Sequence, residues 1–271
     1  MSSVHANSIM PWIYTTNVDC NGLNSRWDYI MEHTEFFSIV APTVYLLSNN
    51  GTDLEINPSG CESKTLEEFS ADFPKYNIMV YPHVAYDKVT ISSLRDGILG
   101  NLTIQDEFLN KLLNKSLKFN YTGYSFDLFP SNDELGFIKK EDGRKYARLV
   151  DNFAIKLHKI GKKLRVYTEP GDNFSNIELL SKTNVDLIIT QAYEYSIDFA
   201  TFITKLYYAI THTNRSKLGI GLCPSCLPHD FTPNAIEYRI RQLIHYNISQ
   251  LGIWSSGVPD LWLPFLRKFL K

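Results

Sequence analysis

The chain has 271 residues, a formal net charge of −2, 44% hydrophobic residues and 21% charged residues, which is typical of a soluble globular protein. A near-neutral chain without a basic stripe is a poor match for phosphate-backbone binding, and no window approaches the roughly 18 uninterrupted apolar residues that span a bilayer. We therefore expect no nucleic-acid partner and no membrane partner. The length suits a single domain, and an α/β barrel of about 250 residues is the commonest way to use it.

Short runs rich in β-branched and aromatic residues recur along the chain, and each is followed by a polar loop and a segment with helical period. The predicted strands are 9–14, 38–46, 78–82, 124–128, 164–168, 185–192, 218–222 and 252–255. The predicted helices are 25–33, 66–73, 104–117, 143–160, 176–181, 199–212, 233–246 and 261–270.

Strict alternation of strands and helices favours parallel strands joined by right-handed crossovers. Helix starts are marked, since Thr103 stands three residues before Asp106 and Thr232 precedes Pro233. Eight such units predict one (β/α)8 TIM barrel over residues 1–271. A doubly wound open sheet is the alternative, although no Gly-rich turn follows the first strand to hold a dinucleotide.

The carboxyl ends of the strands of such a barrel face one pocket. The residues expected there are mostly aromatic, with a few acids: Trp12, Tyr14, Tyr45, His83, Asp127, Glu169, Tyr193, Glu194, the Cys223 loop and Trp254. Aromatic faces stack on sugar rings, while carboxylates bind hydroxyls or transfer protons. The set therefore suits a glycan better than a phosphate or a nucleotide.

Four segments carry a family resemblance. Residues 120–130, NYTGYSFDLFP, are similar to the D-G-x-D-x-D-x-E signature that ends strand four in glycoside hydrolase family 18, the chitinase-like barrels. Residues 185–194 resemble the family's strand six, which ends in a Tyr-Asp pair, and residues 217–222 resemble its strand seven. Residues 252–254, with Trp262, Leu266 and Leu270, resemble strand eight and the closing helix. The resemblance covers most of the chain and implies binding of N-acetylglucosamine-type glycans.

The strand-four signature is degenerate. Aligned on Gly123, Thr122 and Ser125 stand at the family's first two acids. Asp127 stands at the third, and Phe129 stands where the family has its catalytic Glu. In the family this Glu protonates the glycosidic oxygen, and the adjacent Asp orients the substrate's N-acetyl group. General acid catalysis contributes typically 10²- to 10⁴-fold, so the resemblance implies a catalytically impaired barrel.

The resemblance implies that the binding apparatus is retained. Trp254 matches the tryptophan that forms the floor of the central sugar subsite, and Tyr193 matches the tyrosine that contacts the N-acetyl group. Glu194 occupies the position of the family's strand-six Asp. The expected substrate-binding residues are Tyr14, Tyr45, His83, Gln191, Tyr193, Glu194 and Trp254. The leading hypothesis is a glycan-binding pseudoenzyme, expected to be a monomer.

Two alternatives remain open. An active glycoside hydrolase would use Asp127 with Glu169 or Glu134, because hydrolysis needs two carboxyl groups about 5 to 9.5 Å apart. The other alternative is a non-catalytic scaffold or interaction protein whose pocket is vestigial.

Four cysteines predict one or two disulfides in an oxidising compartment. Cys223 and Cys226 have C-x-x-C spacing, but no helix begins there to lower a thiol pKa, and a zinc site would need two more ligands, of which His229 offers one at best. We expect a structural disulfide between them, with free thiols as the alternative, and a second disulfide between Cys20 and Cys61. No phosphate-loop, Ser-His-Asp or metal-helix signature is present, and we expect no metal and no cofactor.

Sequons of the form Asn-x-Ser/Thr point to a glycosylated surface. They begin at Asn50, Asn101, Asn114, Asn120, Asn173, Asn214 and Asn247. With the cysteines, they predict a protein that is secreted or resides in the secretory-pathway lumen. No apolar signal segment precedes Ile9, so either the signal has been removed from the chain or the protein is not secreted.

Overall fold

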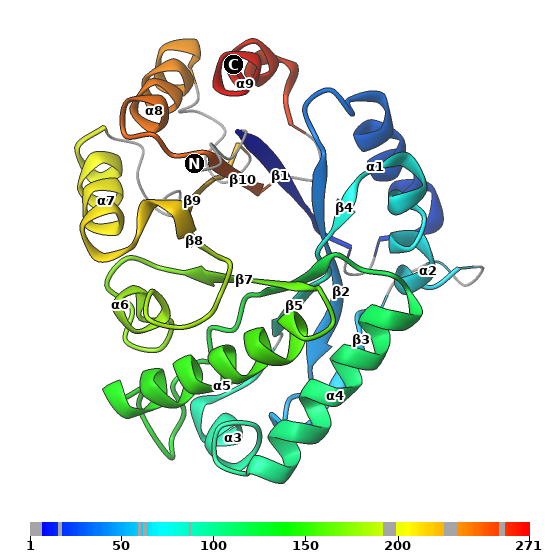
Figure 1. Ribbon diagram of the computed structural model, residues 1–271, viewed down its shortest axis with the longest axis vertical. Coiled ribbons are helices and arrows are strands. Elements are labelled where there is room, and N and C mark those ends of the chain that lie inside the picture. The colour runs from blue at the N-terminus through cyan, green and yellow to red at the C-terminus, as the bar shows by residue number, and fades with distance from the viewer. Residues whose placement is uncertain are drawn as a thin grey trace.

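The computed structural model describes residues 7–15, 18–58, 61, 64–86, 88–191, 199–224, 232–254 and 258–271. A ring of helices surrounds a ring of strands, seen down the barrel in Figure 1. Among the described residues, no helix is long and apolar enough to cross a membrane.

The strands close into a parallel barrel. β1 pairs with β2 on one side and with β10 on the other, so the sheet has no open end there. β3 runs antiparallel to β2 outside the ring. The strands are β1 (Ser8–Ile13), β2 (Ile39–Leu47), β3 (Leu54–Ile56), β4 (Met79–Val80), β5 (His83–Tyr86), β6 (Gly123–Phe126), β7 (Lys163–Thr168), β8 (Leu187–Gln191), β9 (Leu218–Leu222) and β10 (Gln250–Trp254).

The helices cover the outside of the barrel (Figure 1). The α-helices are α1 (Cys20–Glu32), α2 (Leu66–Ser70), α3 (Ile91–Asp96), α4 (Leu102–Lys118), α5 (Lys140–His158), α6 (Ile177–Leu180), α7 (Phe199–His212), α8 (Pro233–His245) and α9 (Leu263–Phe269). Short 3-10 helices are η1 (Phe73–Tyr76), η2 (Arg215–Lys217) and η3 (Asp260–Trp262). The predicted (β/α)8 barrel is confirmed.

Three details differ from the prediction. The third strand is divided into β4 and β5, and the break contains Pro82, which has no N–H to donate to a sheet. The short strand β3 and the six-residue helix α3 are not among the predicted elements, although Thr90 caps α3 by accepting a hydrogen bond from the Ser93 backbone N–H at 3.2 Å. None of these differences changes the order of the barrel strands.

The apolar core has two parts. The outer layer lies between strands and helices and consists largely of fully buried aliphatic and phenylalanine side chains, such as Leu112, Phe153 and Ile220. The interior layer lies within the ring of strands, and Phe129 and Trp254 pack against it while remaining partly buried. The buried members of the interior layer are Met10, Trp12, Ile39, Ala41, Tyr81, Tyr167, Leu187, Ile189 and Cys223.

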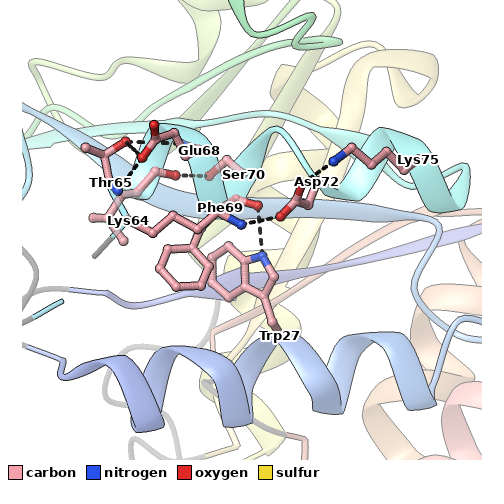
Figure 2. A network of polar contacts seen from close by, with 9 residues as sticks. Trp27, Lys64, Thr65, Glu68, Phe69, Ser70, Asp72 and Lys75 are labelled. Atoms are coloured by element: carbon pink, nitrogen blue, oxygen red, sulfur yellow. Dashed lines mark hydrogen bonds and ion pairs between the residues drawn. The ribbon is translucent and has the colours of Figure 1, made fainter. Parts of the chain in front are cut away.

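Helix α1 is joined to the segment that contains Cys61 and α2 by a disulfide and by a hydrogen bond. Cys20 and Cys61 are bonded, with their Cα atoms 4.6 Å apart, as the sequence predicts. In Figure 2 the Trp27 indole N–H donates to the carbonyl oxygen of Phe69 at 3.0 Å. This hydrogen bond and the disulfide fix the segment that follows β2 against the first helix. Within that segment, Asp72 accepts from Lys75 at 2.6 Å.

Candidate functional site

The side chains of β6 and the residues after it alternate between the two core layers. Asp127 and Phe129 face the barrel interior: Asp127 contacts a histidine of the neighbouring β5, and Phe129 packs against the interior layer. The alternate residues pack in the outer layer, and these are Tyr124, Phe126 and Leu128. The position aligned with the family's catalytic Glu is therefore an inward position, next to that of Asp127.

The Asp127 carboxylate meets side chains from two other strands. It is 7% exposed. Gln191, at the end of β8, donates from Nε2 to Oδ1 at 3.3 Å. His83 of β5 places Nε2 3.1 Å from Oδ2, but its N–H is not aligned for a hydrogen bond. On its other side, His83 Nδ1 lies 3.4 Å from Thr43 Oγ1. Gln191 is therefore the side chain that donates to this carboxylate in the described part of the chain, with His83 packed beside it.

Aromatic rings form the wall beside this carboxylate. The Trp12 indole N–H donates to the Tyr167 hydroxyl, and the two ring centroids are 4.8 Å apart. Trp12 is also 5.4 Å from the Trp254 ring, and His83 is 5.2 Å from the Tyr167 ring. Burial raises the pKa of Tyr167 above its ordinary value, so its hydroxyl stays neutral and can both donate and accept.

Trp254 is the partly exposed member of this wall, whereas Trp12 is buried beneath it. A partly exposed indole ring near a carboxylate offers a surface for an apolar ring face, while the carboxylate accepts from hydroxyl or amide groups. The arrangement is therefore suited to binding a flat, polyhydroxylated ligand.

The two other predicted catalytic acids lie in different surroundings. Glu169 follows β7, the neighbour of β6, and is partly buried. Glu134 is exposed in the loop after β6, next to Asp133, whose carboxylate accepts from Ser92 Oγ at 2.8 Å. Hydrogen bonds from Thr90 and Ser92 lower the pKa of Asp133 to about 2. Glu134 thus belongs to a loop that is anchored to α3.

Tyr45 does not line the interior, which corrects the prediction for this residue. It is fully buried in the outer layer, and its hydroxyl donates to Glu67 Oε1 at 2.8 Å. The cause is a register shift between Thr43 and Tyr45 where β2 pairs with β5. Such an irregularity breaks the alternation of side chains along a strand, so Thr43 faces His83 while Tyr45 turns outward.

The remaining predicted binding residues are only partly described. Tyr14 follows β1 and is 47% exposed. Tyr193 and Glu194 lie outside the described residues, as does Cys226. Cys223 is buried in the interior layer and is disulfide-bonded. Within the described part of the chain, no group of three or more His, Cys, Asp or Glu side chains is placed to hold a metal ion.

Tyr167 and Thr43 were not among the predicted site residues. Tyr167 contacts Trp12, and Thr43 contacts His83. The signal for Tyr167 was the period of two along β7, whose alternate residues Leu164 and Val166 lie in the outer layer. No comparable signal existed for Thr43, because its inward position depends on the irregularity in β2.

No protein-family profile matches the chain, and none of the curated proteins matches it. Solved structures do. A chitinase from Chromobacterium violaceum ATCC 12472 has a TM-score of 0.76 at 11% identity, over 98% of this chain and 99% of that one. A class V chitinase from Pseudomonas fluorescens Pf-5 has a TM-score of 0.76 at 13% identity, over 98% of this chain and 100% of that one.

A third similar structure contains a ligand. It is a mutant of catalytic domain 2 of the Ostrinia furnacalis Group II chitinase in complex with penta-N-acetylchitooctaose, with a TM-score of 0.70 at 13% identity, over 90% of this chain and 89% of that one. At such identities the likeness concerns the fold. The chain therefore has the closed (β/α)8 fold of the chitinase-like barrels.

Proposed function

We propose that this protein is a chitinase-like barrel that binds N-acetylglucosamine-type glycans and has lost chitinase turnover. The observation that carries the proposal is the inward face of the chain after β6. It keeps a buried, oriented carboxylate at Asp127 and presents Phe129 at the next inward position.

Loss of turnover follows from the chemistry of Phe129. Its ring has no proton to give to a glycosidic oxygen, and it packs against an apolar cluster. Asp127 alone can accept a hydrogen bond from an amide or hydroxyl, but glycoside hydrolysis in most families uses a pair of carboxyl groups. The site is therefore expected to hold a sugar without cleaving it.

Glycan binding is supported by the aromatic wall. Trp254 is partly exposed beside the buried Trp12 and Tyr167 rings, and one chitinase of the same fold is in complex with a chito-oligosaccharide. Stacking of a sugar face on Trp254, with Asp127 and Gln191 as polar partners, is the binding mode we propose.

The test combines binding and product analysis. Chito-oligosaccharides and N-glycans are titrated into the protein by calorimetry, and the same mixtures are analysed for products by mass spectrometry. We expect a saturable heat for at least one sugar and no new reducing ends. Absence of a saturable heat for every sugar would instead favour a scaffold protein with a vestigial pocket.

Turnover would support a hydrolase of the same fold. Glu169 is the favoured partner in that case because it is partly buried and follows the strand next to β6. Asp127→Asn and Glu169→Gln would then each abolish product formation. Glu134→Gln is the matched control, because Glu134 is exposed in the anchored loop.

We also propose that the protein is a secreted or lumenal monomeric glycoprotein. Every sequon asparagine is exposed, and these are Asn50, Asn101, Asn114, Asn120, Asn173, Asn214 and Asn247. Intact-mass analysis of protein from a secretory host, before and after glycan removal, tests the proposal. A mass equal to that of the bare polypeptide would contradict it.

A further inference from the structure

A second cavity lies at the opposite mouth of the barrel from Asp127. It has a volume of about 300 Å³, and its lining includes Ser8, Ser38, Tyr81, Lys163, Arg165 and Ser249. Ser8 and Lys163 are the first residues of β1 and β7, and Ser38 and Ser249 immediately precede β2 and β10. This cavity therefore opens at the amino ends of the strands and is separate from the candidate glycan site.

Arg165 is a buried cation in this lining. It is 7% exposed, its guanidinium carbon lies 3.9 Å from the centroid of the Tyr81 ring, and its Nη1 donates to Met10 Sδ at 2.9 Å. Neither partner carries a formal negative charge. Arg165 has no fully buried N–H group that lacks a hydrogen-bond partner. The N–H groups that do not donate to Met10 therefore reach the cavity that Arg165 lines.

Asp186 is the acid of the cavity lining, and it makes its polar contacts to groups other than Arg165 through one carboxylate oxygen. The Asp186 carboxylate lies 2.9 Å from His158 Nε2 and accepts from the Leu164 backbone N–H at 2.8 Å, both at Oδ2. Within the described part of the chain, Arg165 has no ion-pair partner. Lys163 brings a second cation to the same lining.

We propose that this amino-end mouth binds a small oxyanion of the phosphate type, with the Arg165 guanidinium as its anchor. A buried charge without a counter-ion is costly, and the planar fork of a guanidinium matches two oxygens of such an anion. Lys163 and the hydroxyls of Ser38 and Ser249 supply further donors. The volume is at the lower end for ligand pockets, which favours a small anion over a polymer.

Inorganic phosphate is the probe for this site. Calorimetric titration at constant ionic strength, with chloride in the reference, is expected to show saturable binding at one site. Arg165→Met keeps a side chain of similar length without its charge, and we expect it to weaken phosphate binding about 10- to 100-fold. Arg144→Met, on the exposed face of α5, is the matched control and should leave binding unchanged. No saturable binding to the wild type, or equal binding by Arg165→Met, would overturn the proposal.

A second variant decides the question if Arg165→Met does not fold. Ser38 is exposed, so Ser38→Asp should fold while placing a carboxylate in the mouth, and it should weaken phosphate binding at least about tenfold. Ser131→Asp adds the same charge at an exposed position in the loop after β6 and should have no effect. Equal phosphate binding by both variants would overturn the proposal. Because the two mouths are separate, phosphate should not compete with chito-oligosaccharides.

Discussion

The two core layers of the barrel differ in composition and in what they do. The outer layer is mainly aliphatic and phenylalanine side chains, nearly all fully buried. The interior layer contains Trp12, Tyr81 and Tyr167, and it has Asp127 at one mouth and Arg165 at the other. The difference indicates that the outer layer supplies most of the stability, whereas the interior carries the polar groups that a ligand needs. Substitutions in the two layers should therefore have separable effects.

The largest loss of stability is expected in the outer layer. Phe153 of α5 is fully buried, and its ring centroid is 5.1 Å from that of Phe126. Phe153→Ala should lower the free energy of unfolding by about 3–5 kcal/mol, measured by denaturant unfolding. Glycan affinity of the folded fraction should be unchanged. A large loss of affinity would show that the two layers are coupled.

The disulfide is expected to come next. Cys20 and Cys61 are separated by 41 residues, so their bond restricts a long loop in the unfolded chain. The double variant Cys20→Ser with Cys61→Ser should lose about 2–4 kcal/mol of stability. The matched measurement compares the unfolding midpoint of the wild-type protein with and without reductant. An unfolding midpoint that does not move in either comparison would contradict the expectation.

A smaller, pH-dependent effect is expected at Asp142 of α5. Its buried carboxylate accepts from Arg95 at 2.9 and 2.7 Å and from the Lys139 backbone N–H at 2.7 Å. The hydrogen bonds from Arg95 hold the pKa of Asp142 below its ordinary value. A depressed pKa stabilises the fold above the unfolded-state pKa, and this contribution is lost as the pH falls through the folded-state value.

Asp142→Asn should therefore cost about 1–3 kcal/mol near neutral pH. Thermal unfolding of both proteins across a pH series measures the effect. The difference should shrink as the pH falls below about 4. A difference that does not depend on pH would mean that packing, rather than charge, stabilises this contact.

The smallest stability effect is expected in the interior. Gln191→Met replaces the amide that donates to Asp127 with an apolar side chain of similar size. It should cost about 1 kcal/mol, the lower end of the range for removing one partner of a buried hydrogen bond. Affinity for chitopentaose should nevertheless fall about tenfold, because Asp127 loses the group that orients it. Unchanged affinity would remove Gln191 from the site and weaken the contrast between the layers.

The sequence predicted the barrel because eight strand and helix units alternate in it, and it predicted the Cys20–Cys61 bond. It also placed Asp127 among the residues that face the barrel interior, since the end of a short strand can be recognised from local sequence. Tyr45 was misplaced for a physical reason: the irregularity in β2 depends on its pairing with β5, and no local pattern records it. The surroundings of Glu134 could not be predicted for a similar reason. The loop that carries it is held by a hydrogen bond from Ser92 to Asp133, two residues that are far apart in the sequence.

Stacking of a glycan on Trp254 beside Asp127 can be tested by tryptophan fluorescence during titration with chitopentaose. Two matched variants locate the signal: Trp254→Ala within the candidate site, and Trp27→Phe at the contact between α1 and α2. We predict a saturable change in the wild type, its retention in Trp27→Phe and its loss in Trp254→Ala. A saturable change that persists in Trp254→Ala, or none in the wild type, would show that Trp254 does not bind the glycan.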